Sequence, residues 1–133
     1  PSLSSDAGLP DATVTMTMGQ KSMTVNGTKK AIDVTPLIKN GSTYVPIRYV
    51  LDAFGGGAGW NAAAKRIMVL RGSKVLDLTL GNKEFLLNGK RQSAEVAPLS
   101  LNGRTLVPLR LVSEQLGLSV KWAQETKTVT IES

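Results

Sequence analysis

Two copies of one phrase, "NGSTYVPIRYV" at residues 40–50 and "NGRTLVPLRLV" at residues 102–112, decide how this sequence is read. In each copy an Asn-Gly pair leads into Val-Pro, and an arginine follows two positions after the proline. Such a phrase is either a catalytic signature used twice or one piece of architecture built twice. The rest of the chain favours repeated architecture.

The same offset of 62 residues relates positions along nearly the whole chain, without a gap. The matched pairs include Asn26 and Asn88, Pro36 and Pro98, Pro46 and Pro108, Gly55 and Gly117, and Trp60 and Trp122. Self-similarity at a fixed spacing is the signature of an internal repeat. We therefore predict two tandem repeat units, residues 12–71 and 74–133, that together form one compact domain. Residues 1–11 lie outside both units and are expected to be a flexible tail.

Each predicted unit begins with strands and tight turns. The segments "TVTMTMG" (13–19) and "VLDLTLG" (75–81) alternate apolar with polar or small residues, the period of a strand with one buried face. Asn-Gly pairs follow, and they readily take the positive φ angles that a two-residue hairpin turn requires. Each unit ends in a further predicted hairpin, which begins near the tryptophan and closes with "RIMVL" or "KTVTI".

Between these hairpins the apolar period changes to that of a helix. Ile47, Val50, Leu51 and Phe54 have the spacing of one helix face, and the segment after Pro108 follows the same plan. Proline suits the first helical position, and a glycine suits a left-handed C-terminal cap, so Gly55 and Gly117 are expected to end the helices. The predicted fold class is α+β, with antiparallel β-hairpins and one short α-helix in each unit.

The repeated arginines fall in the first turn of each predicted helix, where the helix dipole disfavours a cation. Acidic residues matched between the copies could compensate them. We interpret the prolines and arginines as a structural junction rather than a ligand site, because they are tied to the repeat. The junction residues are Pro46, Arg48, Pro108 and Arg110, and the acidic candidates are Asp33, Asp52, Glu95 and Glu114.

The composition indicates a folded, basic, non-catalytic protein. Of the 133 residues 41% are hydrophobic, the net charge is +6, and there is neither histidine nor cysteine. A basic surface attracts polyanions, but these charges are scattered, so nucleic acid is not a favoured partner. No apolar run approaches a membrane span. The absence of thiols is a mild indication of export without disulfides.

The sequence has few residues suited to catalysis or to metal binding. Without histidine or cysteine there is no triad or thiol nucleophile, and "GGGAG" lacks the Lys-Ser/Thr of a phosphate-binding loop. Thioethers can bind cuprous copper, but core packing is the expected role of Met16, Met18, Met23 and Met68. We therefore predict no enzyme activity, no cofactor and no metal.

The tryptophans are the best candidates for ligand binding. The aromatic faces of Trp60 and Trp122 could stack on sugar rings. Both also occupy a repeat position from which they could cover the helix, and burial is the favoured interpretation.

The pattern Asn-Gly-x-Thr-apolar-Val-Pro-apolar-Arg, a short helix, and a closing tryptophan hairpin resembles the copper amine oxidase N-terminal-like domain. Residues 102–131 carry the closer copy, residues 40–70 a looser one, and the resemblance extends over residues 12–133. It implies an exported, non-catalytic stalk or binding module, of a kind common in wall-associated proteins of Firmicutes. The first copy departs from the pattern at residues 56–59, so we do not expect equal roles for the two halves.

The prediction is a non-catalytic extracellular module, structural or binding, that is secreted and associated with the cell surface or cell wall. Its expected partner is wall glycan or an anionic wall polymer. One alternative is a self-assembling subunit of an extracellular filament or layer, hence a homo-oligomer or homopolymer. A second alternative, suggested by charge alone, is a binder of polyanions or nucleic acid.

Overall fold

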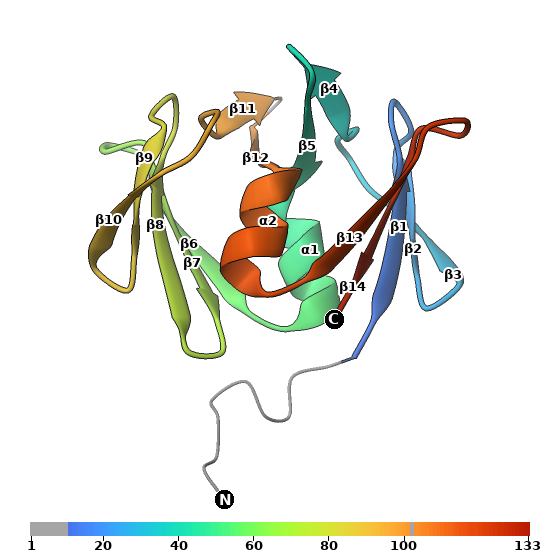
Figure 1. The fold of residues 1–133 in the computed structure, drawn as a ribbon, viewed down its shortest axis with the longest axis horizontal. Coiled ribbons are helices and arrows are strands. Elements are labelled where there is room, and N and C mark those ends of the chain that lie inside the picture. Colours follow the sequence, from blue (N-terminus) through green and yellow to red (C-terminus); the bar gives the residue numbers. More distant parts are fainter. Residues whose placement is uncertain (1–10, 102) are drawn as a thin grey trace, which may run out of the picture.

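The computed structural model describes residues 11–101 and 103–133, which form mainly antiparallel strands with two short helices (Figure 1). Up to residue 71 the elements are β1 (Thr13–Thr17), β2 (Ser22–Val25), β3 (Thr28–Ala31), β4 (Leu37–Lys39), β5 (Ser42–Pro46), α1 (Ile47–Phe54), β6 (Gly57–Asn61) and β7 (Arg66–Arg71). The remaining elements are β8 (Lys74–Thr79), β9 (Glu84–Leu87), β10 (Lys90–Ser93), β11 (Leu99–Leu101), β12 (Arg104–Pro108), α2 (Leu109–Leu116), β13 (Ser119–Ala123) and β14 (Thr128–Glu132). The predicted tail at residues 1–11 lies outside the described residues except for Asp11.

The strands form three antiparallel sheets, and each sheet takes strands from both halves of the chain. The β1 sheet has the order β13-β14-β1-β2-β3, the β8 sheet has the order β10-β9-β8-β7-β6, and the β5 sheet has the order β11-β12-β5-β4. Figure 1 shows the two helices between the β1 sheet and the β8 sheet. The halves are therefore interleaved, and the division into two tandem units stays a prediction.

The repeated Val-Pro phrase lies where the two halves meet. In the pairing of β5 with β12, Val45 stands opposite Val107, its counterpart at the offset of 62. The neighbouring pairs are Tyr44 with Pro108 and Leu106 with Pro46, which are equivalent to each other by the same offset. The pairing of β1 with β14 corresponds in the same way to that of β8 with β7. The two copies of the Val-Pro phrase thus pair with each other in the β5 sheet.

The helices follow the predicted apolar period, but their ends differ in detail from the prediction. Ile47, Val50, Leu51 and Phe54 are all buried. Each proline is the residue before its helix rather than the first helical residue, with extended ψ, so that prediction was wrong by one position. Gly117 caps α2 in the left-handed conformation.

Helix α1 ends differently from α2. Gly55 has φ 81° but ψ 137°, so the predicted left-handed cap is wrong for α1. Gly56 follows with φ 138°, and a Cβ there would lie 2.4 Å from the carbonyl oxygen of Leu70. The chain leaves α1 extended because two successive glycines allow it to pass close to β7.

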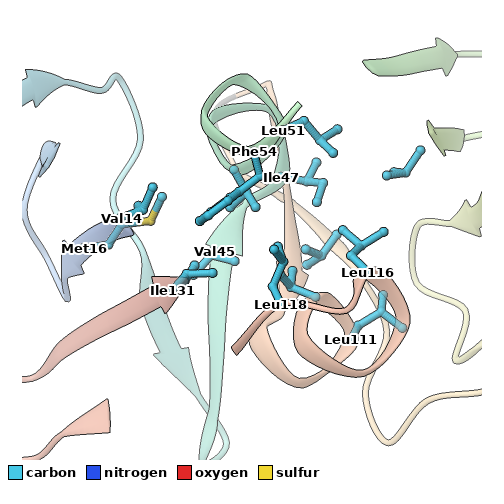
Figure 2. Packing of buried hydrophobic residues seen from close by; sticks show 14 of the residues in the cluster. Val14, Met16, Val45, Ile47, Leu51, Phe54, Leu111, Leu116, Leu118 and Ile131 are labelled. Atoms are coloured by element: carbon cyan, nitrogen blue, oxygen red, sulfur yellow. The ribbon is translucent and has the colours of Figure 1, made fainter. Parts of the chain in front are cut away.

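A continuous core joins both halves around the helices. Figure 2 shows Phe54 of α1 in the same buried cluster as Met16 of β1, Val45 of β5 and Ile131 of β14. Met16 and Met23 are buried opposite each other on β1 and β2, which confirms a packing role for these two. Met68, in contrast, is exposed on β7. The apolar faces of the helices and the inner faces of the sheets are therefore buried in the core. The surface sites described below lie at the starts of the helices and at the edge strands.

Candidate functional site

The two tryptophans are exposed to solvent over a third to a half of their surface, so the expectation that they are buried was wrong. Trp60 is 50% exposed and Trp122 is 37% exposed. Both lie on β6 and β13, which are edge strands of the sheets that the described residues form. A large aromatic side chain at a sheet edge keeps one flank open, because no further strand covers it. Both indoles can therefore be reached by a ligand from solvent.

Trp60 lies at a pocket of about 330 Å³, here called the Trp60 pocket. Three parts of the chain form it: the start of α1, the paired strands β6 and β7, and the β11–β12 hairpin. Its lining includes Arg48, Tyr49, Trp60, Arg104 and Thr105. Because the buried Ile67 stands opposite Trp60 in the β6–β7 pair and also lines the pocket, the indole rests against an apolar wall. The pocket thus combines aromatic surface with two guanidinium groups.

Asp33 organises the polar side of this pocket. The Arg104 guanidinium donates to it from Nε (3.0 and 3.1 Å) and from Nη2 (2.5 Å). The Tyr49 hydroxyl donates to Asp33 Oδ1 at 2.8 Å. These hydrogen bonds, Arg104 first and Tyr49 second, lower the pKa of the Asp33 carboxyl to about 2. The same contact raises the pKa of Tyr49 and of Arg104. Asp33 is therefore an anion at any physiological pH, and it holds Arg104 in a fixed orientation.

Arg104 was not singled out in the sequence, although one signal was available. The position equivalent to Arg104 in the first half is Ser42, so the arginine breaks the repeat. A charged residue that departs from an otherwise shared pattern is a candidate for a role found in one half alone. Arg104 lies outside the set of residues common to both halves, from which the candidate residues were predicted.

The corresponding start of α2 borders a second pocket of about 470 Å³, here called the Arg110 pocket. Arg110 Nη1 donates to Glu95 at 2.6 Å, and Arg110 Nε lies 3.4 Å from Glu114. Both carboxylates also line the pocket. The two acidic partners that the sequence offered for this arginine are thus both in contact with it.

Arg48 has a different environment from Arg110. Among residues 11–101 and 103–133 it forms no ion pair, although Asp52 follows four positions later on α1. Asp33, its other suggested partner, is bound to Arg104 instead. The symmetric pairing suggested for the two arginines is therefore wrong for Arg48. Its guanidinium remains available at the Trp60 pocket.

Trp122 differs from Trp60 in its surroundings. Its indole Nε1 donates to Gln124 Oε1 at 2.8 Å, and it lines neither the Trp60 pocket nor the Arg110 pocket. The structure thus places one of the two predicted ligand-binding tryptophans at a pocket and the other outside both. Its ligand-binding role stays a prediction.

Thioethers are the one type of copper ligand that the sequence offered as a candidate. Copper sites in proteins use imidazole, thiolate or thioether donors, and the sequence has no histidine and no cysteine. In the part of the chain that the structure describes, no group of three or more acidic residues could hold a metal ion. The two methionines that face each other, Met16 and Met23, are enclosed in the core. The donor set present does not fit a copper centre.

The described residues form a β-rich domain with a surface pocket at the start of each helix. A family model for the copper amine oxidase N-terminal domain matches residues 6–68 and 24–131, and the chain belongs to this family. That domain is a non-catalytic accessory domain. No curated protein matches the sequence. Neither helix of the described chain is long and apolar enough to cross a membrane.

Proposed function

We propose that this protein is a non-catalytic binding module that acts outside the cell and attaches to cell-wall glycan. The observation that carries the proposal is the exposed indole of Trp60 at a pocket of about 330 Å³. Membership in a family of accessory domains supports a binding role over a catalytic one. Location at the cell surface is part of the proposal, since wall glycan is found there.

The Trp60 pocket has the composition expected of a sugar site. Binding pockets combine apolar and aromatic walls with a few polar groups that fix orientation. The indole offers a flat face for the C–H groups of a pyranose ring, while Tyr49, Ser100 and Thr105 supply hydroxyl groups at the same pocket. The indole of Trp60 is 50% exposed, so much of its apolar surface is in contact with water. A sugar ring stacked on the indole would remove that surface from water, which is favourable.

Co-sedimentation with purified Gram-positive cell walls tests this function. We expect the protein to sediment with the walls, the Trp60→Ala variant to remain largely in the supernatant, and the matched Trp122→Ala variant to behave as the parent. Thermal unfolding of both variants checks that each is folded. A folded parent protein that stays in the supernatant at all wall concentrations contradicts the proposal.

Self-assembly is a second candidate, favoured by the edge strand β6. Edge strands are usually protected against pairing by charged side chains. The edge strands β3 and β10 carry two such residues each, Lys29 with Lys30 and Lys90 with Arg91, whereas β6 reads Gly-Ala-Gly-Trp-Asn. Exposed Met68 and Leu70 lie on the adjacent strand β7. A segment of another copy could add to this edge.

Sedimentation velocity over a range of concentrations tests assembly. Gly59→Lys places a charge on β6, where a Cβ meets nothing within 4 Å, so the fold should tolerate it. We expect the parent to form larger species, Gly59→Lys to suppress them, and the control Thr28→Lys on the charged edge β3 to leave them unchanged. A parent protein that is monomeric at every concentration excludes this function.

We also propose that the two halves are copies of one ancestral unit. The supporting observation is that equivalent elements begin 62 residues apart, as α1 does at Ile47 and α2 at Leu109. Interleaved sheets of this kind would arise from a dimer of single units whose chains later became joined.

A further inference from the structure

We infer that the Trp60 pocket selects a sugar unit carrying a negative charge, with Arg48 and Arg104 at the charged group and Trp60 against the ring. This inference rests on the proposed function and names the chemistry of its ligand. A carboxylate on the sugar and a phosphodiester beside it share that chemistry. Both groups accept hydrogen bonds from guanidinium.

The contrast between the two pockets carries the inference. Among the described residues, the lining of the Trp60 pocket includes two arginines and no carboxylate, and Asp33 outside the lining pairs with one of them, Arg104. The lining of the Arg110 pocket includes one arginine and two glutamates, Glu95 and Glu114, and both glutamates contact Arg110. The two pockets at equivalent helix starts therefore differ in charge: cations exceed carboxylates in the lining of the Trp60 pocket, and carboxylates exceed cations in that of the Arg110 pocket. An anionic ligand is favoured at the Trp60 pocket.

Arg48 is the first group suited to the ligand. It lies in the first turn of α1, is exposed, and forms no ion pair with the described residues. Its counterpart Arg110 already binds two carboxylates. A guanidinium with no internal partner can bind an incoming anion without first breaking an ion pair.

Arg104 is the second group, and Asp33 prepares it. Asp33 engages Nε and Nη2 of Arg104, while Nη1 makes no hydrogen bond with the described residues. Since the ion pair fixes the guanidinium plane, less side-chain entropy is lost when Nη1 binds a ligand. Lys30 lies 5.8 Å from the centre of the Tyr49 ring, which adds a third cation near the pocket against the single charge of Asp33. Three cations, Arg48, Arg104 and Lys30, thus lie at or near the pocket, and the carboxylate of Asp33 pairs with one of them.

Intrinsic fluorescence can report on this pocket directly, because the chain has two tryptophans. In a Trp122→Phe background the emission comes from Trp60 alone, and in a Trp60→Phe background it comes from Trp122. The probes are polygalacturonate oligomers for the carboxylate, glycerol-phosphate polymer for the phosphodiester, and dextran as an uncharged glycan. We expect Trp60 emission to change with at least one charged probe, with dextran binding weaker by about tenfold or more, which corresponds to one charge-assisted hydrogen bond. Trp122 emission should stay constant.

Variants in the Trp122→Phe background identify the charged contacts. Arg48→Gln and Arg104→Gln should each weaken the charged probe about tenfold. Arg48→Lys should recover part of the affinity, and the matched Arg110→Gln should have no effect. Circular dichroism and unfolding midpoints confirm that each variant is folded.

The outcomes separate this inference from the proposed function. If walls bind and the Trp60 site binds dextran as well as the charged probes, the function stands and the charge selection is wrong. If walls bind but Arg48→Gln and Arg110→Gln behave alike, the placement of the anion is wrong. Tighter binding of single-stranded DNA than of either glycan probe would overturn the sugar ligand. If the folded parent binds neither walls nor any probe, the proposed function fails together with the inference.

Discussion

Replacing Phe54 with alanine should show whether both halves of the chain unfold as one unit. Phe54 ends α1, is fully buried, and belongs to the same core cluster as Val14 and Met16 of β1 and Ile131 of β14 (Figure 2). The helix of the first half therefore packs in one core with strands from both halves. A cavity at this position should weaken the entire molecule.

The expected loss is large relative to the total stability. A buried phenylalanine reduced to alanine typically costs about 3–5 kcal/mol, from lost transfer free energy and from the cavity left behind. Domains of ordinary stability unfold with about 5–15 kcal/mol. For a chain of this length the change corresponds to a fall in the unfolding midpoint of about 10–20 °C.

Scanning calorimetry provides the measurement, and the second half provides the matched control. Leu116, the counterpart of Phe54 on α2, is also fully buried. We expect Phe54→Ala and Leu116→Ala each to shift one common transition, with Phe54→Leu shifting it less. Two transitions, of which Phe54→Ala moves one and Leu116→Ala moves the other, would refute a shared cooperative core.

Three further changes test particular contacts. Gly56→Ala should lower the free energy of unfolding by about 1–3 kcal/mol, because the positive φ of Gly56 and the nearby carbonyl oxygen of Leu70 exclude a Cβ. The control Gly59→Ala should leave the free energy of unfolding nearly unchanged, and urea titration of both variants measures the difference. Arg110→Ala should lower stability by less than about 1 kcal/mol, since its ion pairs are solvent-exposed; an unchanged midpoint with lost ligand binding would reverse its structural assignment. Asp33 has a folded-state pKa of about 2, below its usual 3.8. Its contribution to stability should therefore be complete above pH 3.8 and should disappear as the pH falls through 2. The unfolding midpoint of Asp33→Asn should vary less over this pH range than that of the parent protein.

Features that depend on neighbouring residues could be predicted from the sequence. The Asn-Gly pair at 26–27 has positive φ at both positions, as does its counterpart at 88–89, and each connects two paired strands as expected. The Asn-Gly pair at 102–103 includes a residue outside the described part of the chain. The helix positions also agree with the apolar period. These features follow from turn geometry and side-chain period, which act within a few residues.

The candidate site could be predicted in part. The sequence named Trp60 as a ligand-binding candidate and Arg48 as a structural junction residue, and the structure places both at one pocket. It could not show that Asp33 binds Arg104, which is 71 positions away in the chain, in place of Arg48. Nor could it show that Trp60 is open to solvent. That exposure depends on β6 being a sheet edge, and the apolar character of the residue suggested burial.

The sequence by itself determined the family resemblance, the repeated phrase, and the order of turns, strands and helices, because these are written in short-range patterns. Tertiary structure alone decided that β1 pairs with β14 and β5 with β12, two pairings between strands far apart in the chain. Every hairpin of either half could in principle meet several partners, and the core that joins them selects one. That selection also fixes which strands are edges. It leaves Trp60 exposed beside Arg48 and gives the two related helix starts different charges, because their surroundings come from distant parts of the chain.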